Sequence, residues 1–344
     1  MPGPVGPDRI RQVAAAALEV GGVDDAEVLF LHEWGGLTRF ASSAIHQSTW
    51  REDTGLRVRV VAGNRIGVAG TNDFSEAGAR AAAENAREMA GVVAPDPLFP
   101  GLAPRDVLED DSGFDDATAS TDPRQRAEGV AALVAQCGDG YEAAGAFETT
   151  GSEVAVANTR GQFCWAPRSM ASLTTVVTGG DGGSGFAEVF APDVGEIDPA
   201  SIGRRAAGKA KASERPGDLD PGRYVVVLEP SAVSTLVGFL AWIGFGGRLI
   251  AEGRSCLSGR HGEQVAADVM TIYDDAVAPG TLGIPFDFEG VRRSRVDLID
   301  RGVFRDGVYD RRTARLASKE STGHALPPPN PEGPVPQNRF MAPG

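Results

Sequence analysis

Residues 55–71 alternate between polar and apolar side chains, which restricts this part of the chain to extended strands. Arg57 and Arg59 flank Val58, so the two arginines lie on one face of a strand and the valine on the other. The pair Gly63-Asn64 then interrupts the alternation with residues that tolerate positive φ, a strong signal for a tight hairpin turn. Two antiparallel strands of a sheet with one solvated face are therefore expected here.

Similar short runs recur along the first two thirds of the chain. Strands are predicted at 26–31, 37–41, 45–50, 55–61, 65–71, 143–149, 153–158, 162–165 and 170–178. Thr150-Gly151 and Ala166-Pro167 are interpreted as turns between members of an antiparallel meander. Helices are expected at 10–18, at 75–90 with Ser75 as N-cap, and from Pro123 to about Cys137. The pattern predicts an α+β protein.

The order of these segments divides the chain into parts. An N-terminal α/β unit spans 1–92, and a proline-containing acidic connection spans 93–122. A central domain at 123–215 consists of a helix followed by the antiparallel meander. A β-rich C-terminal domain covers 222–344.

The C-terminal domain is expected to open with buried elements. Tyr224–Leu228 is mostly β-branched and is predicted to be a buried strand. The apolar segment from Ser231 to Phe245 is too short to span a membrane and is predicted to be a buried helix, with Ile243 inside. Shorter strands are expected at 269–273, 295–299 and 303–308.

Charge and cysteine content exclude several classes of function. Lys plus Arg number 33 and Asp plus Glu number 47, a net charge of −14, which argues against a nucleic-acid-binding protein. The three cysteines form no CxxC pair and cannot make a disulfide framework, which favours a reducing cytoplasm. Neither a signal peptide nor a membrane span is recognisable.

Few residues suggest chemistry by their pattern. His32-Glu33 lacks the second histidine of HExxH and is interpreted as part of a loop. Asp274, Asp287 and Glu289 could provide carboxylates for acid–base work, or could bind backbone amides in turns. The residues by themselves reveal no legible active site.

Several segments taken together resemble one known family. They are 37–47, 55–60, 65–72, 253–255, 262–265, 271–275, 286–291, 298–303 and 321–325. Their order and spacing over nearly the whole chain resemble the TldD/PmbA family, also named peptidase U62 or modulator of DNA gyrase. The resemblance implies a three-part α+β fold. It also implies that family members continue beyond residue 344, so the last domain is expected to be truncated, with an exposed sheet edge.

The resemblance also indicates which branch of the family this is. TldD-like chains carry HExxxH on the helix that here spans 231–245, and Gly238, Phe239 and Ile243 fall at the positions of the first His, the Glu and the second His. None of the three can bind zinc or activate water. The chain is therefore similar to the PmbA/TldE branch, with no catalytic or metal-binding residue and no cofactor of its own; zinc is expected only in a TldD-like partner.

These implications define the expected function. The chain would be the non-catalytic subunit of a cytoplasmic TldD-type zinc metallopeptidase complex, helping to bind peptides or unfolded proteins for proteolysis or peptide maturation. Arg39, His46, Asp287 and Glu289 are the candidate contacts to peptide or partner. A homodimer is expected where no TldD-like partner exists. The alternatives are a stand-alone binding or scaffold protein, and a hydrolase that uses the carboxylates without zinc.

Overall fold

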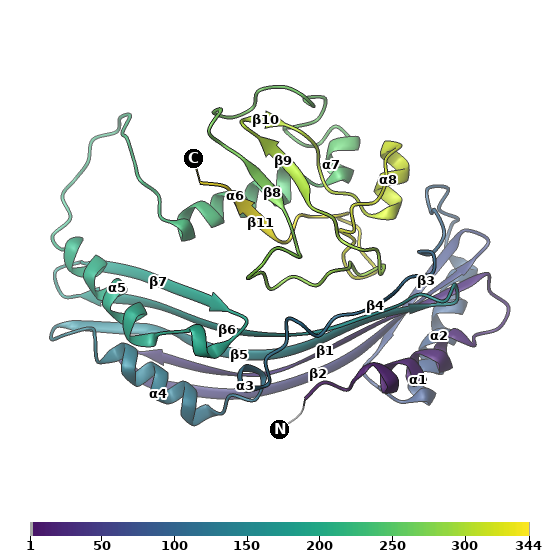
Figure 1. The fold of residues 1–344 in the computed structure, drawn as a ribbon, viewed down its shortest axis with the longest axis horizontal. Helices are drawn as coiled ribbons and strands as arrows, with labels where there is room; N and C mark the ends of the chain where they lie inside the picture. The colour runs from purple at the N-terminus through teal and green to yellow at the C-terminus, as the bar shows by residue number, and fades with distance from the viewer. Residues whose placement is uncertain (1–2, 344) are drawn as a thin grey trace.

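Two sheets form the framework of the chain, which is described from residue 3 to residue 343 by a computed structural model. The first has seven strands in the order β3-β2-β1-β5-β6-β4, with β7 also pairing with β6. Its strands are β1 Asp25–Ala41, β2 Ala44–Ala62, β3 Arg65–Thr71, β4 Val107–Glu109, β5 Tyr141–Asn158, β6 Phe163–Gly179 and β7 Ser184–Ala191. All pairings are antiparallel except that of β4 with β6. The strands predicted in both the first and the central parts thus share one curved sheet (Figure 1).

The strands are longer than predicted, because the expected internal turns at Thr150-Gly151 and Ala166-Pro167 are absent. Both pairs lie inside continuous strands, β5 and β6. Gly151 serves packing instead: a Cβ at this position would overlap the ring of Trp34 from the neighbouring strand. His32, expected in a loop, likewise lies buried in the middle of β1.

Helices cover the convex face of this sheet. They are α1 Pro7–Leu18, α2 Glu76–Val92, α3 Asp116–Ala119, α4 Pro123–Val134 and α5 Pro199–Ala212, with a 3-10 turn at Val194–Glu196. The predicted cap of α2 is confirmed, since Ser75 Oγ accepts from Gly78 N at 3.0 Å. Small alanines on α1 and α2 let these helices pack closely against the sheet at one end, and α4 and α5 cover the other end.

The C-terminal part lies in the concavity of the large sheet (Figure 1). It contains α6 Pro230–Gly244, α7 Gly247–Ala251, β8 Ile272–Asp274, β9 Val296–Asp300, β10 Val303–Phe304, α8 Arg311–Ala317 and β11 Arg339–Met341. Its four strands form a separate sheet in the order β10-β9-β8-β11. The α+β fold class is confirmed.

The acidic connection is an ordered part of this assembly. It supplies α3 and β4, and its carboxylates pair with arginines of the C-terminal part: Asp96 with Arg312 at 2.6 Å and Asp106 with Arg292 at 2.6 Å. Because these ion pairs join segments far apart in the sequence, the connection helps to hold the C-terminal part against the large sheet.

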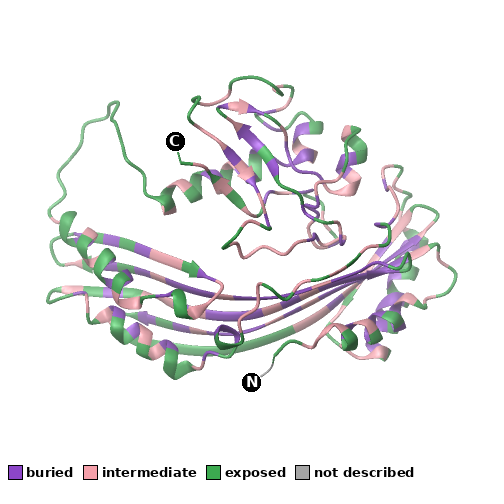
Figure 2. Ribbon diagram, in the orientation of Figure 1, coloured by how far each residue is buried: buried purple, intermediate pink, exposed green. Residues whose placement is uncertain are grey.

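Two predictions about the start of the C-terminal part are wrong. Tyr224–Leu228 forms no strand and is exposed along its length, as Figure 2 shows. Ile243 is 53 % exposed, because α6 packs on its domain through another face, whose buried residues are Val237, Ala241 and Gly244. Apolar composition predicted burial, but no described element covers these side chains. None of the helices in residues 3–343 is long and apolar enough to cross a membrane.

Candidate functional site

A large cavity lies on the concave face of the large sheet, beside the C-terminal part. It has a volume of about 630 Å³ and is walled by β1, β2, the end of β3, β5 and Phe288. A second cavity of about 300 Å³ shares Glu33, Arg51 and Ser152 with the first and continues across β5 and β6 to Leu282. We call the two together the concave groove.

The walls of the concave groove carry charges of both signs. Arg51 pairs with Glu33 across β1 and β2. Asn72, at the end of β3, donates to Asp53 Oδ1 at 3.0 Å and to Thr54 O at 2.9 Å. Arg57 donates to Pro328 O at 2.8 Å and so closes the groove toward the C-terminal part. Such a surface suits a polar, extended ligand better than an apolar small molecule.

An open strand edge adjoins the groove. β3 pairs with β2 only from Leu56 to Ala62, so 44–54 has β1 as its single neighbour. Residues 44–53 are nearly all exposed, and the outward N–H and C=O groups of this edge are free to pair with another strand. The open edge begins where β3 ends and the groove starts.

Two predicted contact residues lie at the far end of this edge. Arg39 on β1 and His46 on β2 are both exposed. The register of β1 with β2 shifts here, because Arg39 pairs with Gln47 and Phe40 with Ile45, which leaves His46 as the extra residue of a bulge. The structure thus places Arg39 and His46 close to each other and outside the concave groove.

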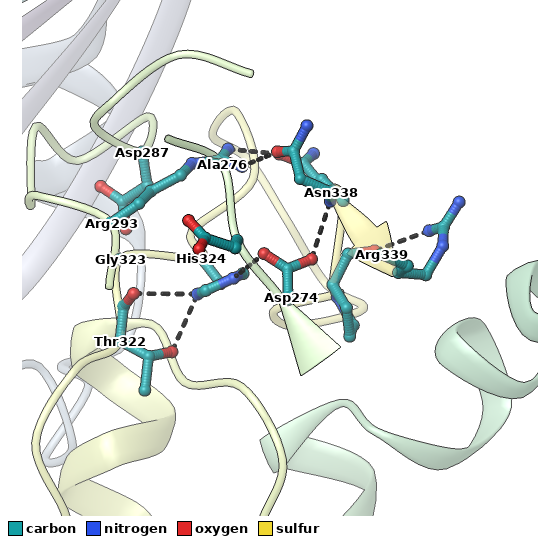
Figure 3. Close-up of polar contacts among 12 residues, drawn as sticks. Asp274, Ala276, Asp287, Arg293, Thr322, Gly323, His324, Asn338 and Arg339 are labelled. Atoms are coloured by element: carbon teal, nitrogen blue, oxygen red, sulfur yellow. Dashed lines mark hydrogen bonds and ion pairs between the residues drawn. The ribbon is translucent and has the colours of Figure 1, made fainter. Parts of the chain in front are cut away.

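Asp274 and His324 form a buried pair inside the C-terminal part. His324 Nε2 lies 2.9 Å from Asp274 Oδ1, and both side chains are fully buried. Asn338 N donates to Asp274 Oδ2 at 2.7 Å, and Thr322 contacts the other ring nitrogen of His324 (Figure 3). Burial raises the pKa of Asp274, but the hydrogen bond and charge of His324 lower the pKa by a larger amount. The net shift of the pKa is therefore downward.

Asp287 is buried in a turn of the same part. It accepts hydrogen bonds from the backbone N–H groups of Glu289 and Val291 at 2.9 Å each and of Ala325 at 2.8 Å. Burial, and then the nearby Glu289 carboxylate, raise the pKa of Asp287 to about 7. Its oxygens join the turn at 287–291 to the segment at Ala325.

Glu289, in a turn of the C-terminal part, joins that part to the large sheet. Arg59 of β2 contacts Glu289 at 3.0 Å and the buried Glu27 of β1 at 2.7 Å. Burial lowers the pKa of Arg59, but the two carboxylates raise it by more. Glu289 is thus a bridge between parts of this chain.

These contacts bear on the carboxylate hydrolase considered from the sequence. Both oxygens of Asp274 and of Asp287 accept hydrogen bonds within the fold, and Glu289 pairs with Arg59. A general base must reach the proton it removes, and these groups already have partners inside the protein. The geometry does not favour this alternative.

The three positions that correspond to HExxxH lie on α6. Phe239 is 60 % exposed, and a Cβ at Gly238 would meet nothing nearer than Arg339 Nη2 at 4.0 Å. Zn²⁺ needs nitrogen, sulfur or oxygen ligands. The side chains of Phe239 and Ile243 are hydrocarbon, and Gly238 has no side chain and lies near the cationic Arg339, so the three positions do not fit the metal. Residues 3–343 contain no group of three His, Cys, Asp or Glu side chains placed to hold a metal.

Sequence reasoning missed the residues of the concave groove. Glu33 lies on β1 and Arg51 and Asp53 lie on β2, in stretches of polar alternation that resemble any solvated sheet face. The run Arg51-Glu52-Asp53, between the strands predicted at 45–50 and 55–61, was the available signal, but only the register shows that Arg51 and Glu33 share a wall.

A curved sheet that holds a second, smaller sheet in its concavity defines the architectural class. Three family models match successive parts of the chain. They are PmbA/TldA metallopeptidase domain 1 at residues 26–90, the central domain at 104–214 and the C-terminal domain at 221–344. The chain belongs to the PmbA/TldD family.

Individual relatives agree with this assignment. The chain is 25% identical over 331 residues to a metalloprotease PmbA of Escherichia coli O157:H7, which covers 92% of this chain and 73% of that protein. A metalloprotease of Methanothermobacter thermautotrophicus is 29% identical over 144 residues, 42% of this chain and 31% of that protein.

Two solved structures share the fold. A candidate modulator of a DNA gyrase from Thermotoga maritima has a TM-score of 0.84 at 19% identity, and TldE from Thermococcus kodakarensis has a TM-score of 0.79 at 21% identity. Each comparison covers 98% of this chain and 77% of the other chain.

Proposed function

We propose that this chain is a non-catalytic, PmbA/TldE-like subunit of a cytoplasmic zinc metallopeptidase complex, in which a TldD-like partner holds the metal. Gly238, Phe239 and Ile243 support this proposal, because none of them can replace a zinc ligand. The names of the relatives, a metalloprotease PmbA and a TldE, are consistent with it.

The chain's own task in the complex is to hold an extended peptide. The observation that carries this proposal is the open edge of β2 at 44–54, which begins where β3 ends and runs beside the concave groove. A peptide that continues the line of β3 would pair its backbone with β2. Backbone pairing tolerates varied side chains, as a subunit that handles different peptides requires.

The groove explains a further preference. Arg51, Glu33 and Asp53 line the concave groove on β1 and β2, so charged side chains of a bound peptide would find partners of opposite charge there. Arg39 and His46 would meet the other end of a peptide that follows the whole edge. Asp287 and Glu289 would act indirectly, by fixing the C-terminal part against the sheet.

Peptide binding by the purified chain tests this role. A fluorescent, extended peptide is titrated against the wild type, Arg51→Glu and Arg87→Glu, with anisotropy as the readout. Arg51 and Arg87 each pair with a surface glutamate, but Arg87 lies on α2 on the convex side. We expect Arg51→Glu to weaken binding about tenfold, or 1.4 kcal/mol, and Arg87→Glu to leave it unchanged.

A second titration separates strand pairing from simple charge attraction. A peptide that is N-methylated at alternate residues keeps its side chains but loses the N–H groups that a strand must donate. Equal binding of the methylated and plain peptides would contradict pairing at the β2 edge.

Cleavage tests the division of labour. The chain alone should leave the peptide intact by mass spectrometry, and addition of a TldD-like chain should give cleavage that a chelator stops. Peptide binding without any effect on a TldD-like chain would favour a stand-alone binding protein. Chelator-resistant cleavage by the chain alone would overturn the non-catalytic assignment.

A further inference from the structure

The open edge of β2 is closed at one end by the residue that follows β3. Asn72 donates through Nδ2 to Thr54 O at 2.9 Å, so this outward carbonyl of β2 already has a partner. After Asn72 the chain leaves the edge and turns into α2 on the convex side of the sheet (Figure 1). A strand added along 44–53 therefore meets an obstacle beside Asn72.

The concave groove gives such a strand little room to continue. The cavity of about 630 Å³ lies at the same end of the edge and has Thr71, Asn72 and Asp53 in its wall. Arg57 closes it toward the C-terminal part through the hydrogen bond to Pro328 O. This position therefore favours a chain end of a bound peptide over its middle.

The backbone geometry of the sheet decides which end of the peptide lies here. Because the N–H and C=O groups of alternate residues point to the same edge, the outward carbonyl of Thr54 implies that Glu52 and Trp50 also point outward. β3 pairs with β2 in the antiparallel sense, which is the more stable kind of pairing. A peptide that extends the line of β3 runs in the same direction as β3, so its N-terminus lies at Asn72.

The charges at this end of the edge suit an ammonium group. Glu33 and Asp53 lie directly opposite each other on β1 and β2, and like charges in this arrangement are unfavourable without a cation. Arg51 pairs with Glu33, whereas within residues 3–343 Asn72 is the one side chain that hydrogen-bonds to Asp53. A charged N–H group would bond to the second oxygen of Asp53, but a C-terminal carboxylate would be repelled by both acids.

We propose that this site selects the free N-terminus of a peptide. The N-terminal residue lies opposite Asp53 and its ammonium group donates to the Asp53 carboxylate, while the following residues pair with β2 toward Ile45. Because opposite residues share a face of the sheet, the first side chain of the peptide enters the concave groove that Asp53 lines. The preference rests on the peptide-binding role proposed for this edge, and it makes Asp53 a specificity-determining residue.

Two peptides of one sequence, both labelled at the C-terminus, test the preference. One has a free N-terminus and the other is acetylated there, and each is titrated against the chain with anisotropy as the readout. Acetylation removes the positive charge but keeps every side chain. We expect it to weaken binding to the wild type about tenfold, the scale for loss of one hydrogen bond to a charged group.

Asp53→Asn and Glu52→Gln form a matched pair of variants. Each removes one negative charge from β2, but Glu52 lies on the opposite face of the strand, with Oε1 at 3.4 Å from His32 Nε2. We expect Asp53→Asn to bind the free peptide as weakly as the wild type binds the acetylated one. Glu52→Gln should keep the full preference for the free peptide.

A photo-crosslinker tests the direction of the peptide. Benzoylphenylalanine at the first position of the peptide should attach to the chain near Asp53 and Asn72. The same group at the last position should attach near Ile45. Mass spectrometry of the digested protein locates both attachments.

The results separate this preference from the peptide-binding role. Equal binding of the free and acetylated peptides, still weakened by Arg51→Glu, would leave that role standing and refute the selection of an N-terminus. A preference that Asp53→Asn leaves unchanged, or attachment of the first position near Ile45, would refute it as well. Absence of binding by either peptide would refute the peptide-binding role itself, and the preference with it.

Discussion

Replacement of His324 by alanine should destabilise the C-terminal part strongly. Asp274 and His324 are both fully buried, and among residues 3–343 His324, at 2.9 Å, is the one side chain that hydrogen-bonds to Asp274. The variant leaves the Asp274 carboxylate in the interior with the Asn338 N–H alone. A buried charge without its partner is more costly than the pair was favourable.

The magnitude follows from that burial. Loss of one partner of a buried ion pair costs about 3–5 kcal/mol, and a typical domain is stable by about 5–15 kcal/mol. We therefore expect His324→Ala to remove about a fifth or more of the stability of this part. The pKa of Asp274 is lowered in the fold, so the stabilisation is present above the unfolded pKa and is lost as the pH falls through the folded pKa.

His261→Ala is the matched control. His261 also lies near an aspartate, Asp306, at 3.3 Å in the same part of the chain, but its side chain is 40% exposed. An exposed pair is worth at most about 1 kcal/mol, so this variant should unfold nearly as the wild type does.

Hydrogen exchange followed by mass spectrometry is the assay, because it reports the C-terminal part separately from the large sheet. Peptides that contain β8 and β11 should lose protection in His324→Ala and keep it in His261→Ala. Asp274→Asn added to His324→Ala should recover part of the loss, since it removes the unpaired charge. Equal protection in the two histidine variants would refute the argument.

Four shorter predictions concern other features of the chain. Ile243→Asp should unfold within about 0.5 kcal/mol of the wild type by denaturant titration, because the side chain is 53% exposed. The pKa of Asp287 is raised to about 7 from 3.8, so the wild type should lose stability as the pH rises from 4 to 7, and Asp287→Asn should show a weaker pH dependence in thermal melts. The dialysed chain should hold no stoichiometric zinc by elemental analysis. Gly238→His, Phe239→Glu and Ile243→His combined should create no peptidase, and cleavage by that variant would show that a further ligand is present.

Local sequence patterns predicted element type well. Alternation at 55–71 and the Gly63-Asn64 turn define the β2–β3 hairpin, in which Ala62 pairs with Arg65. Ser75 caps α2, and Asp122 caps α4 in a capping box with Gln125. These features depend on neighbours in the chain, so the sequence contains the information directly.

Strand length was mispredicted where glycine and proline are used for packing. Gly151 reads locally as a turn residue, but it makes room for Trp34 of β1. Pro167 lies inside β6 opposite Glu153. A short-range pattern cannot distinguish a turn from a place where another side chain passes close to the backbone.

The sequence by itself determined the α+β class, the hairpins, the caps and the absence of zinc ligands at Gly238, Phe239 and Ile243, because each depends on residue type or on near neighbours. Only the tertiary structure decided that β1 and β5 pair and so merge two predicted units into one sheet. It also decided which part of the β2 edge has no neighbouring strand, and that the side chain of Val225 is exposed while that of Asp274 is buried. Burial and strand pairing of this kind depend on residues that lie far apart in the sequence, and composition alone cannot assign those partners.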